Sequence, residues 1–201
     1  MNLRFYDFET LEKELEGLST QHRIAFAAAC CERLLPNYNA FAREESWGAP
    51  SLLRTALDEV WQILKGKPVD VATLQKLRSA CDSYDIVPHS DDFCGYVAEA
   101  QEAAIAIYKT LDACIEPTLQ HIIEIAERVA FTIEFSTDWD VSIETEKYIE
   151  TIARHPFTVR EMAKQNEILE RLKNTKELNY DLLEWLRTSF DNGGKSLIDL
   201  G

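Results

Sequence analysis

The stretch over residues 24–35 constrains the fold more than any other part of the chain. Its apolar residues recur every three to four positions, which is the spacing of one helix face. Phe26 and Cys30 are apolar as well, and at helical geometry they lie on other faces. A helix that is apolar on every side is normally buried on every side. The sequence therefore predicts a central helix over about residues 20–35, surrounded by other helices. Pro36 either ends it or starts the next turn, and a separate short helix is expected over about 37–46.

The rest of the chain also follows a helical pattern. Only seven Gly and six Pro occur among 201 residues, which favours long helices. No segment alternates with period two for long enough to predict a strand. The longest apolar patterns, over about 91–115 and 117–137, are joined by almost no loop, and this predicts a long antiparallel helical hairpin over about 91–137. We predict an all-α fold: one domain over residues 1–201, a bundle of about eight helices, with the apolar tail 197–200 docked on it.

Charge and cysteine content exclude several classes of function. The net charge is −14 and is spread over both halves of the chain, so phosphate backbones and anionic membrane surfaces are repelled. Five cysteines without a C-x-x-C pair or a zinc-type spacing fit free thiols in a reducing compartment. The N-terminal residues lack the apolar run of a signal peptide. We predict a cytoplasmic protein that binds no nucleic acid, membrane, metal or cofactor.

Two motifs carry a resemblance to a known family. The first reads Cys31-Glu32-Arg33-x-x-Pro36-Asn37-Tyr38-x-x-Phe41, then Gly48, then Arg54-x-x-Leu57-Asp58-x-x-Trp61. The second reads Ser90-x-Asp92-Phe93-x-x-Tyr96. Both resemble the signature of the YjaG-like bacterial proteins, a family with a domain of unknown function. The resemblance implies an all-helical, cytoplasmic protein with no assigned activity and no catalytic residues to transfer. It also implies a link to histidine-kinase signalling.

The first motif contains the candidate site. Its charged, amide and aromatic members are Glu32, Arg33, Asn37, Tyr38, Arg54, Asp58 and Trp61, and Asp92 of the second motif is a further candidate. Charges next to a buried helix must be paired, so these groups form either a structural network between the helices over about 20–35 and 50–65 or a ligand pocket. In a pocket, Arg33 or Arg54 would anchor an anion, and Trp61 and Tyr38 would form walls.

A carboxylate metal site is a weaker alternative. Glu99-x-x-Glu102 and Glu124-x-x-Glu127 resemble the paired acids of all-α nucleoside-triphosphate pyrophosphatases, although the second pair of that family usually ends in Asp. In a tight hairpin the two pairs miss each other by on the order of 14 Å, at 1.5 Å of rise per residue. Glu102 and Glu124 are also expected to point away from the apolar stripes. We therefore predict a solvated acidic face here.

Residues of other catalytic types lack suitable partners. None of the four histidines has a second ligand at metal-binding spacing. Cys30 and Cys31 lie in a buried helix, where a thiol is unreactive. We predict a non-enzymatic binding protein whose partner is another protein or a second copy in a homodimer. The alternative is a small-molecule-binding protein or enzyme with a pocket around Glu32, Arg33, Arg54, Asp58 and Trp61. A metal-dependent nucleotide hydrolase comes third.

Overall fold

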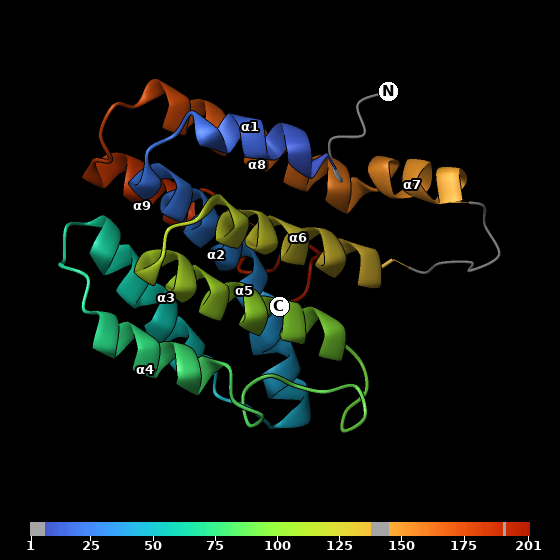
Figure 1. Ribbon diagram of the computed structural model, residues 1–201. Coiled ribbons are helices and arrows are strands. Elements are labelled where there is room, and N and C mark those ends of the chain that lie inside the picture. The colour runs from blue at the N-terminus through green and yellow to red at the C-terminus, as the bar shows by residue number, and fades with distance from the viewer. Residues whose placement is uncertain (1–6, 138–144, 191) are drawn as a thin grey trace.

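The fold is described from a computed structural model, over residues 7–137, 145–190 and 192–201. These residues form nine α-helices and no strand, so the all-α prediction is confirmed (Figure 1). The helices are α1 (Phe8–Glu16), α2 (Thr20–Glu45), α3 (Pro50–Leu64), α4 (Val71–Cys81), α5 (Val97–Ile115), α6 (Leu119–Phe135), α7 (Thr145–Arg154), α8 (Pro156–Asn174) and α9 (Tyr180–Thr188).

Helix α2 is the predicted central helix, but Pro36 does not end it. A proline inside a helix costs about 3 kcal/mol, because it has no N–H and its ring crowds the preceding turn. Packing offsets this cost, since Tyr38 and Phe41 beyond the proline are almost completely buried. The N–H of Leu197 in the C-terminal tail also donates to the Arg33 carbonyl at 3.2 Å. Tertiary contacts therefore extend α2 to Glu45, although local chemistry predicted that the helix would stop at Pro36.

The predicted antiparallel hairpin is formed by α5 and α6, which lie side by side (Figure 1). Its first helix begins at Val97, later than the expected start near residue 91. Gly95 has φ +72°, a left-handed conformation that does not continue into a helix. Phe93 packs edge-on against Phe41 of α2, with ring centroids 5.3 Å apart. This contact holds the segment before α5 against the end of α2 as a loop.

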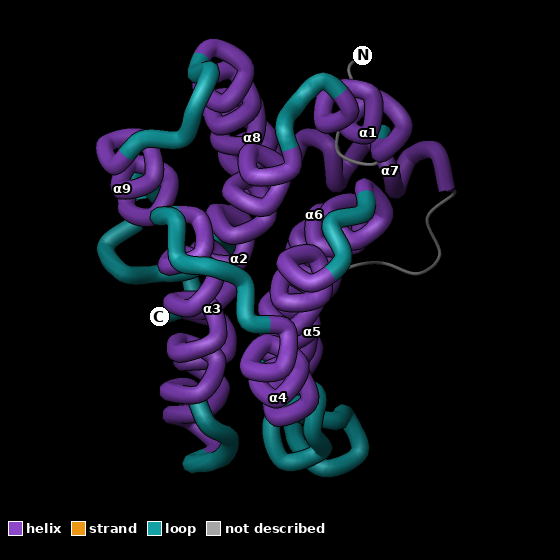
Figure 2. Tube along the Cα trace, turned by 60° about the vertical axis from the view of Figure 1, so that its left-hand side comes forward, coloured by secondary structure: helices purple, strands orange, loops and turns teal. Residues whose placement is uncertain are grey.

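Helix α2 lies in the middle of the described bundle, with other helices packed around it (Figure 2). Helix α2 contacts α3, α5, α6, α8 and α9, and this explains why it is apolar on every face. Helix α4 packs on α5 and α3, α1 packs on α6, and α7 packs on α8. Within the described ranges, no helix has the length and apolarity needed to cross a membrane.

The C-terminal tail docks on the bundle, as its apolar sequence suggested. Ser196 and Leu197 are completely buried. Arg160 of α8 donates to the Leu197 carbonyl at 2.6 Å, and the Asn192 side chain donates to the Ser196 carbonyl at 2.8 Å. The tail thereby joins α8 to the middle of α2.

Candidate functional site

Glu32 is the centre of an ion network between α2, α3 and α9. Its two carboxylate oxygens accept two hydrogen bonds from Arg54, at 2.7 and 2.8 Å. One of them also accepts from the indole N–H of Trp61 at 2.7 Å. Arg54 pairs in turn with Asp58, one helical turn later, at 2.9 Å. The predicted pairing of Arg54 with Asp58 is therefore present, and Glu32 joins it to α2.

A residue far along the chain completes this network. Arg187 of α9 donates to Asp58, and its Nε lies 3.5 Å from Glu32. Two guanidinium groups thus balance two carboxylates, with Trp61 completely buried below them. No sequence pattern pointed to Arg187, because it is 129 residues from Asp58 and belongs to no motif. These contacts favour the structural interpretation of the cluster, in which its charges hold three helices together.

Arg33 belongs to a second, separate ion pair. Its Nε and one terminal nitrogen donate to the two oxygens of Glu161 in α8, at 2.8 and 2.6 Å. Both side chains are only 1% exposed. Burial alone would lower the pKa of Arg33, but the Glu161 carboxylate outweighs burial and raises the pKa above its usual range. Gln165 donates to the same carboxylate at 2.9 Å. A buried, bidentate pair of this kind leaves no capacity to anchor an anion.

Tyr38 and Asn37 are buried but differ in how they are satisfied. The Tyr38 hydroxyl donates to the Ile86 carbonyl at 2.7 Å and accepts from the Ala49 N–H at 3.3 Å. It therefore links α2 to the loop before α3, through Ala49, and to the loop after α4, through Ile86. Asn37 is completely buried, and neither polar atom of its side chain has a hydrogen-bond partner among the residues that the structure describes.

Asp92 lies outside both networks. It is exposed, and it accepts a hydrogen bond from Tyr84 on its own loop at 2.5 Å. The ring of His89 stacks on Tyr84, with centroids 4.6 Å apart. The structure therefore does not bring Asp92 to the first motif.

The histidines and most cysteines have structural roles. His22 lies between Ser19 and the Thr175 carbonyl, His121 bonds the Glu116 carbonyl, and the His155 side chain caps α8. Four cysteines are buried, and Cys94 is exposed. Burial raises the pKa of Cys30 to about 11, so at neutral pH it carries no thiolate for nucleophilic attack.

One member of each acidic pair of the hairpin makes an ion pair between α5 and α6, and Glu99 is buried at 6% exposure, so its pair is not the predicted solvated face. Lys109 bonds Glu124 at 2.8 Å, and Arg128 lies 3.1 Å from Glu102. The expectation that Glu102 points outward was wrong, because it is only 5% exposed. Arg128 reaches it from α6, which the apolar pattern did not reveal. Across the described ranges, no group of three or more His, Cys, Asp or Glu is placed to hold a metal ion.

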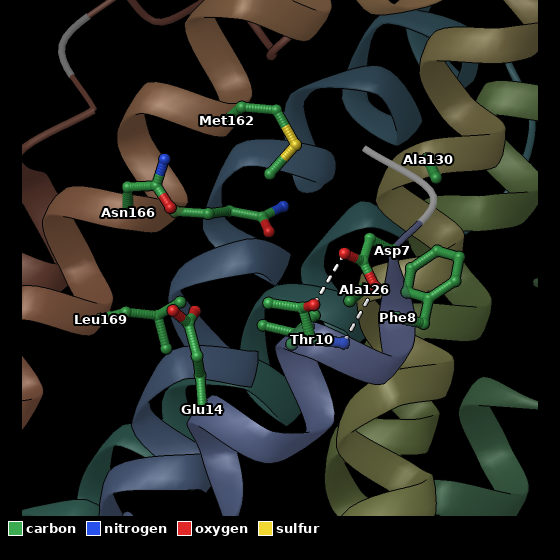
Figure 3. A pocket seen from close by; sticks show the side chains of 11 residues that line it. Asp7, Phe8, Thr10, Glu14, Ala126, Ala130, Met162, Asn166 and Leu169 are labelled. Carbon is green, nitrogen blue, oxygen red and sulfur yellow. Dashed lines mark hydrogen bonds between the residues drawn. The ribbon is translucent and has the colours of Figure 1, made fainter. Parts of the chain in front are cut away.

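A small cavity lies between α1, α6 and α8 (Figure 3). Its wall is apolar where Ala126 and Ala130 of α6 face Met162 and Leu169 of α8. On the α1 side, Asp7 caps the helix by accepting from the Thr10 N–H at 3.0 Å. The free volume is about 30 Å³, which is close to the share of liquid volume of one water molecule. No metabolite fits there unless side chains move.

A larger recess is an open groove between the end of α8 and the start of α9. Its volume is about 490 Å³. Its lining residues are Glu167, Glu170, Arg171, Asn174, Thr175, Asp181, Leu182 and Trp185. These residues form no motif, and nothing in the sequence pointed to them.

The family assignment rests on a match along nearly the whole chain. The model of the family described as "Protein of unknown function (DUF416)" matches residues 10–201. The chain belongs to the DUF416 family.

Known DUF416 relatives agree with the resemblance found in the two motifs. The uncharacterized protein YjaG of Escherichia coli K12 is 27% identical over 191 residues, which cover 92% of this chain and 93% of YjaG. An uncharacterized protein of Haemophilus influenzae is 28% identical over 201 residues, which cover 94% of this chain and 96% of that protein. The crystal structure of a DUF416 family protein from Shewanella baltica superposes with a TM-score of 0.84 at 26% identity, over 94% of this chain and 97% of that one. DUF416 membership thus agrees with the fold and assigns no activity.

Proposed function

We propose that this DUF416 protein is a non-enzymatic binding protein that holds a basic segment of a partner protein in the α8–α9 groove. The observation that carries the proposal is the groove itself. At about 490 Å³, it falls within the range typical of ligand sites, about 300–1,000 Å³. It is open along one side, as a groove for a peptide segment must be.

The charge of the groove indicates the kind of partner. Three carboxylates and one guanidinium line it, which gives a local charge of −2. Glu167 is already paired with Lys164 and Arg171. Glu170 and Asp181 are exposed and make no ion pair with any residue that the structure describes. Basic side chains are therefore the complementary ligands, and the overall charge of −14 adds long-range attraction.

Trp185 gives the groove an aromatic wall. The guanidinium of Arg171 lies 3.8 Å from its ring centroid, and the ammonium of Lys164 lies 4.6 Å from it. The indole is only partly buried, so part of its surface stays available. Tryptophan is the aromatic side chain that attracts cations most strongly. Because Arg171 and Lys164 already lie over this ring, a partner would meet the remaining apolar surface of the indole, and its basic side chains would pair with the carboxylates of the groove.

The groove continues past Trp185 toward the C-terminal tail. A second recess of about 270 Å³ shares Glu167 with the first and is lined by Arg160, Lys164 and Phe190, among others. Its local charge is +1, so it suits an uncharged or acidic part of the bound segment. The two recesses follow α8 for several turns, which suits an extended peptide more than a compact metabolite.

The first motif supports binding over catalysis indirectly. Its charged side chains are paired with one another or with Glu161 and Arg187. A pocket around Glu32 and Arg54 would require these pairs to open, at the cost of leaving partly buried charges without partners. A cytoplasmic location and a partner from histidine-kinase signalling stay predictions from the sequence and the family. Such a partner would have to present a basic segment.

The test measures the fluorescence anisotropy of a labelled Arg- and Lys-rich peptide titrated with the protein at physiological salt. An acidic peptide of equal length is the comparison. The variant combines Glu170→Lys with Asp181→Lys. We expect the basic peptide to bind and the double variant to bind roughly tenfold more weakly, because two exposed ion pairs contribute about 0.2–1 kcal/mol each and the reversed charges add repulsion.

The matched control combines Glu44→Lys with Glu45→Lys at the exposed end of α2, which changes the net charge by the same amount. An equal loss in both double variants would show that binding follows net charge and not the groove. Failure of the basic peptide to bind at all would also reject the proposal. Sedimentation velocity tests whether the groove instead binds a second copy of the chain. If the protein is a dimer and only the groove variant dissociates it, the groove is assigned to the second copy.

A further inference from the structure

Along the seam between α2 and α8, each helix carries a buried polar side chain that no group in the described part of the chain satisfies. Asn37 of α2 is 0% exposed, and within the described ranges both its Oδ1 and its Nδ2 atom lack a hydrogen-bond partner. Thr158 of α8 is 1% exposed, and among the same residues its Oγ1 atom also lacks one. Buried polar side chains in folded proteins almost always bond to protein or to ordered water. Two such residues in one seam therefore require an explanation.

Two contacts show that α2 and α8 run in opposite directions. Near the start of α2, the His22 Nε2 atom lies 2.8 Å from the carbonyl of Thr175, directly after α8 ends. Further along α2, Arg33 bonds Glu161, which lies near the start of α8. The helices are thus antiparallel along the seam.

This register places the two unsatisfied side chains at one level. Asn37 follows Arg33 by four residues, or about 6 Å along α2. Thr158 precedes Glu161 by three residues, or about 4.5 Å along α8 in the same direction. Residues three or four apart also share a helix face. Asn37 and Thr158 therefore lie at the same level of the two helices, one turn beyond the buried ion pair and on the faces that carry it.

The C-terminal tail closes the seam next to this point. Ser196 and Leu197 are completely buried, and the Leu197 N–H bonds the carbonyl of Arg33. Any molecule bound between Asn37 and Thr158 is consequently enclosed. The charges beside it are paired: Arg33 with Glu161, and Arg160, which also bonds the Leu197 carbonyl, with Asp199. The site is therefore closed and neutral.

We propose that the seam is a binding site for ordered water held between Asn37 and Thr158. An amide presents both a donor and an acceptor, and a hydroxyl presents either, so the ligand must donate and accept as well. Water does both and needs two to four such partners when buried. About two molecules in a short chain would satisfy all three side-chain atoms. The internal water is then part of the packing of α2 on α8, because it supplies the hydrogen bonds that Asn37 and Thr158 do not make to protein groups.

The direct test is a crystal structure of the full chain at atomic resolution. We expect ordered density within hydrogen-bond distance of the Asn37 amide and the Thr158 hydroxyl. In solution, water-to-amide nuclear Overhauser effects should appear at Asn37 and Thr158. A dry seam, or direct hydrogen bonds from both side chains to protein groups, would overturn the proposal.

The sign of the change in melting temperature caused by Thr158→Val is an independent test. If water is bound, removing the hydroxyl takes a partner from it, and the melting temperature falls by roughly 2–4 °C. In a dry seam the same change removes an unsatisfied group, and the melting temperature rises. Thr132→Val is the matched control, because Thr132 is equally buried and donates to the Arg128 carbonyl at 2.9 Å. The proposal requires Thr158→Val to change stability in the same direction as this control.

Discussion

At the scale of single residues, the charges of the first motif depend most on two partners that lie outside the motif. Glu161 neutralises Arg33, and Arg187 joins Glu32 and Asp58 across to α9. The two pairs differ in burial. Arg33 and Glu161 are 1% exposed, whereas Arg187 and Asp58 are 29% and 43% exposed. We therefore expect the first pair to dominate the stability of the motif.

Glu161→Ala tests this expectation. The change leaves the Arg33 guanidinium buried without a counter-charge, and it should lower the free energy of unfolding by about 3–5 kcal/mol in a urea titration. Glu150→Ala is the control, since Glu150 is 52% exposed and lies 3.9 Å from Arg154. Its loss should stay below about 1 kcal/mol. Similar losses in both variants would contradict the structural role given to the buried pair.

Gly48 is the second residue whose identity the structure explains. Its φ is +85°, and a Cβ atom there would lie 2.4 Å from the Tyr38 hydroxyl oxygen. Gly48→Ala should therefore cost about 1–3 kcal/mol from backbone strain, plus a clash that weakens the Tyr38 hydrogen bonds. Gly66→Ala is a matched comparison, because Gly66 has φ +101° and an added Cβ would have no atom of the described residues within 4 Å apart from its chain neighbours. Denaturant titrations that find equal losses would rule out the clash.

At the scale of elements, the α5–α6 hairpin contains a carboxylate that its own pattern does not reveal. Burial raises the pKa of Glu102 to about 7, and Arg128 only partly opposes this. Glu124 behaves differently. Burial would raise its pKa too, but the Lys109 ammonium outweighs burial and lowers it. The two acids should therefore respond to pH in opposite ways.

This difference predicts a pH dependence of stability. The pKa of Glu102 is higher in the folded chain than the unfolded value of about 4.3, so the folded state binds more protons between these values. Its stabilising contribution is complete below the unfolded pKa and is lost as pH rises toward about 7. Glu102→Gln should remove this loss, so the variant gains stability relative to the wild type between pH 5 and pH 8, as measured by urea unfolding at each pH. Glu124→Gln should show no such gain, because a lowered pKa acts below pH 5. Parallel curves for the wild type and Glu102→Gln would contradict the assignment.

At the scale of the whole molecule, one distinction separates the predictions that held from those that did not. The spacing of apolar residues along the chain shows which face of each helix is buried, and does not depend on which neighbour covers that face. It therefore predicted the all-α class, the buried central helix and the hairpin, and the family motifs pointed to the same fold. Boundaries were less predictable. Pro36 and Gly95 act locally, but contacts with Leu197 and Phe41 decide whether the chain continues as a helix beside them.

The identity of the charged partners was decided only by tertiary structure. Arg54 and Asp58 could be paired from their spacing, because positions four apart share a helix face. Glu161 and Arg187 could not, because 128 and 129 residues separate them from Arg33 and Asp58, and many surface acids and bases compete for such roles. The groove between α8 and α9 was invisible for the same reason: a concave surface arises from the docking of two helices and leaves no period in either. Local chemistry thus set which segments are helical and which faces they bury, whereas the assembled bundle set which polar groups meet.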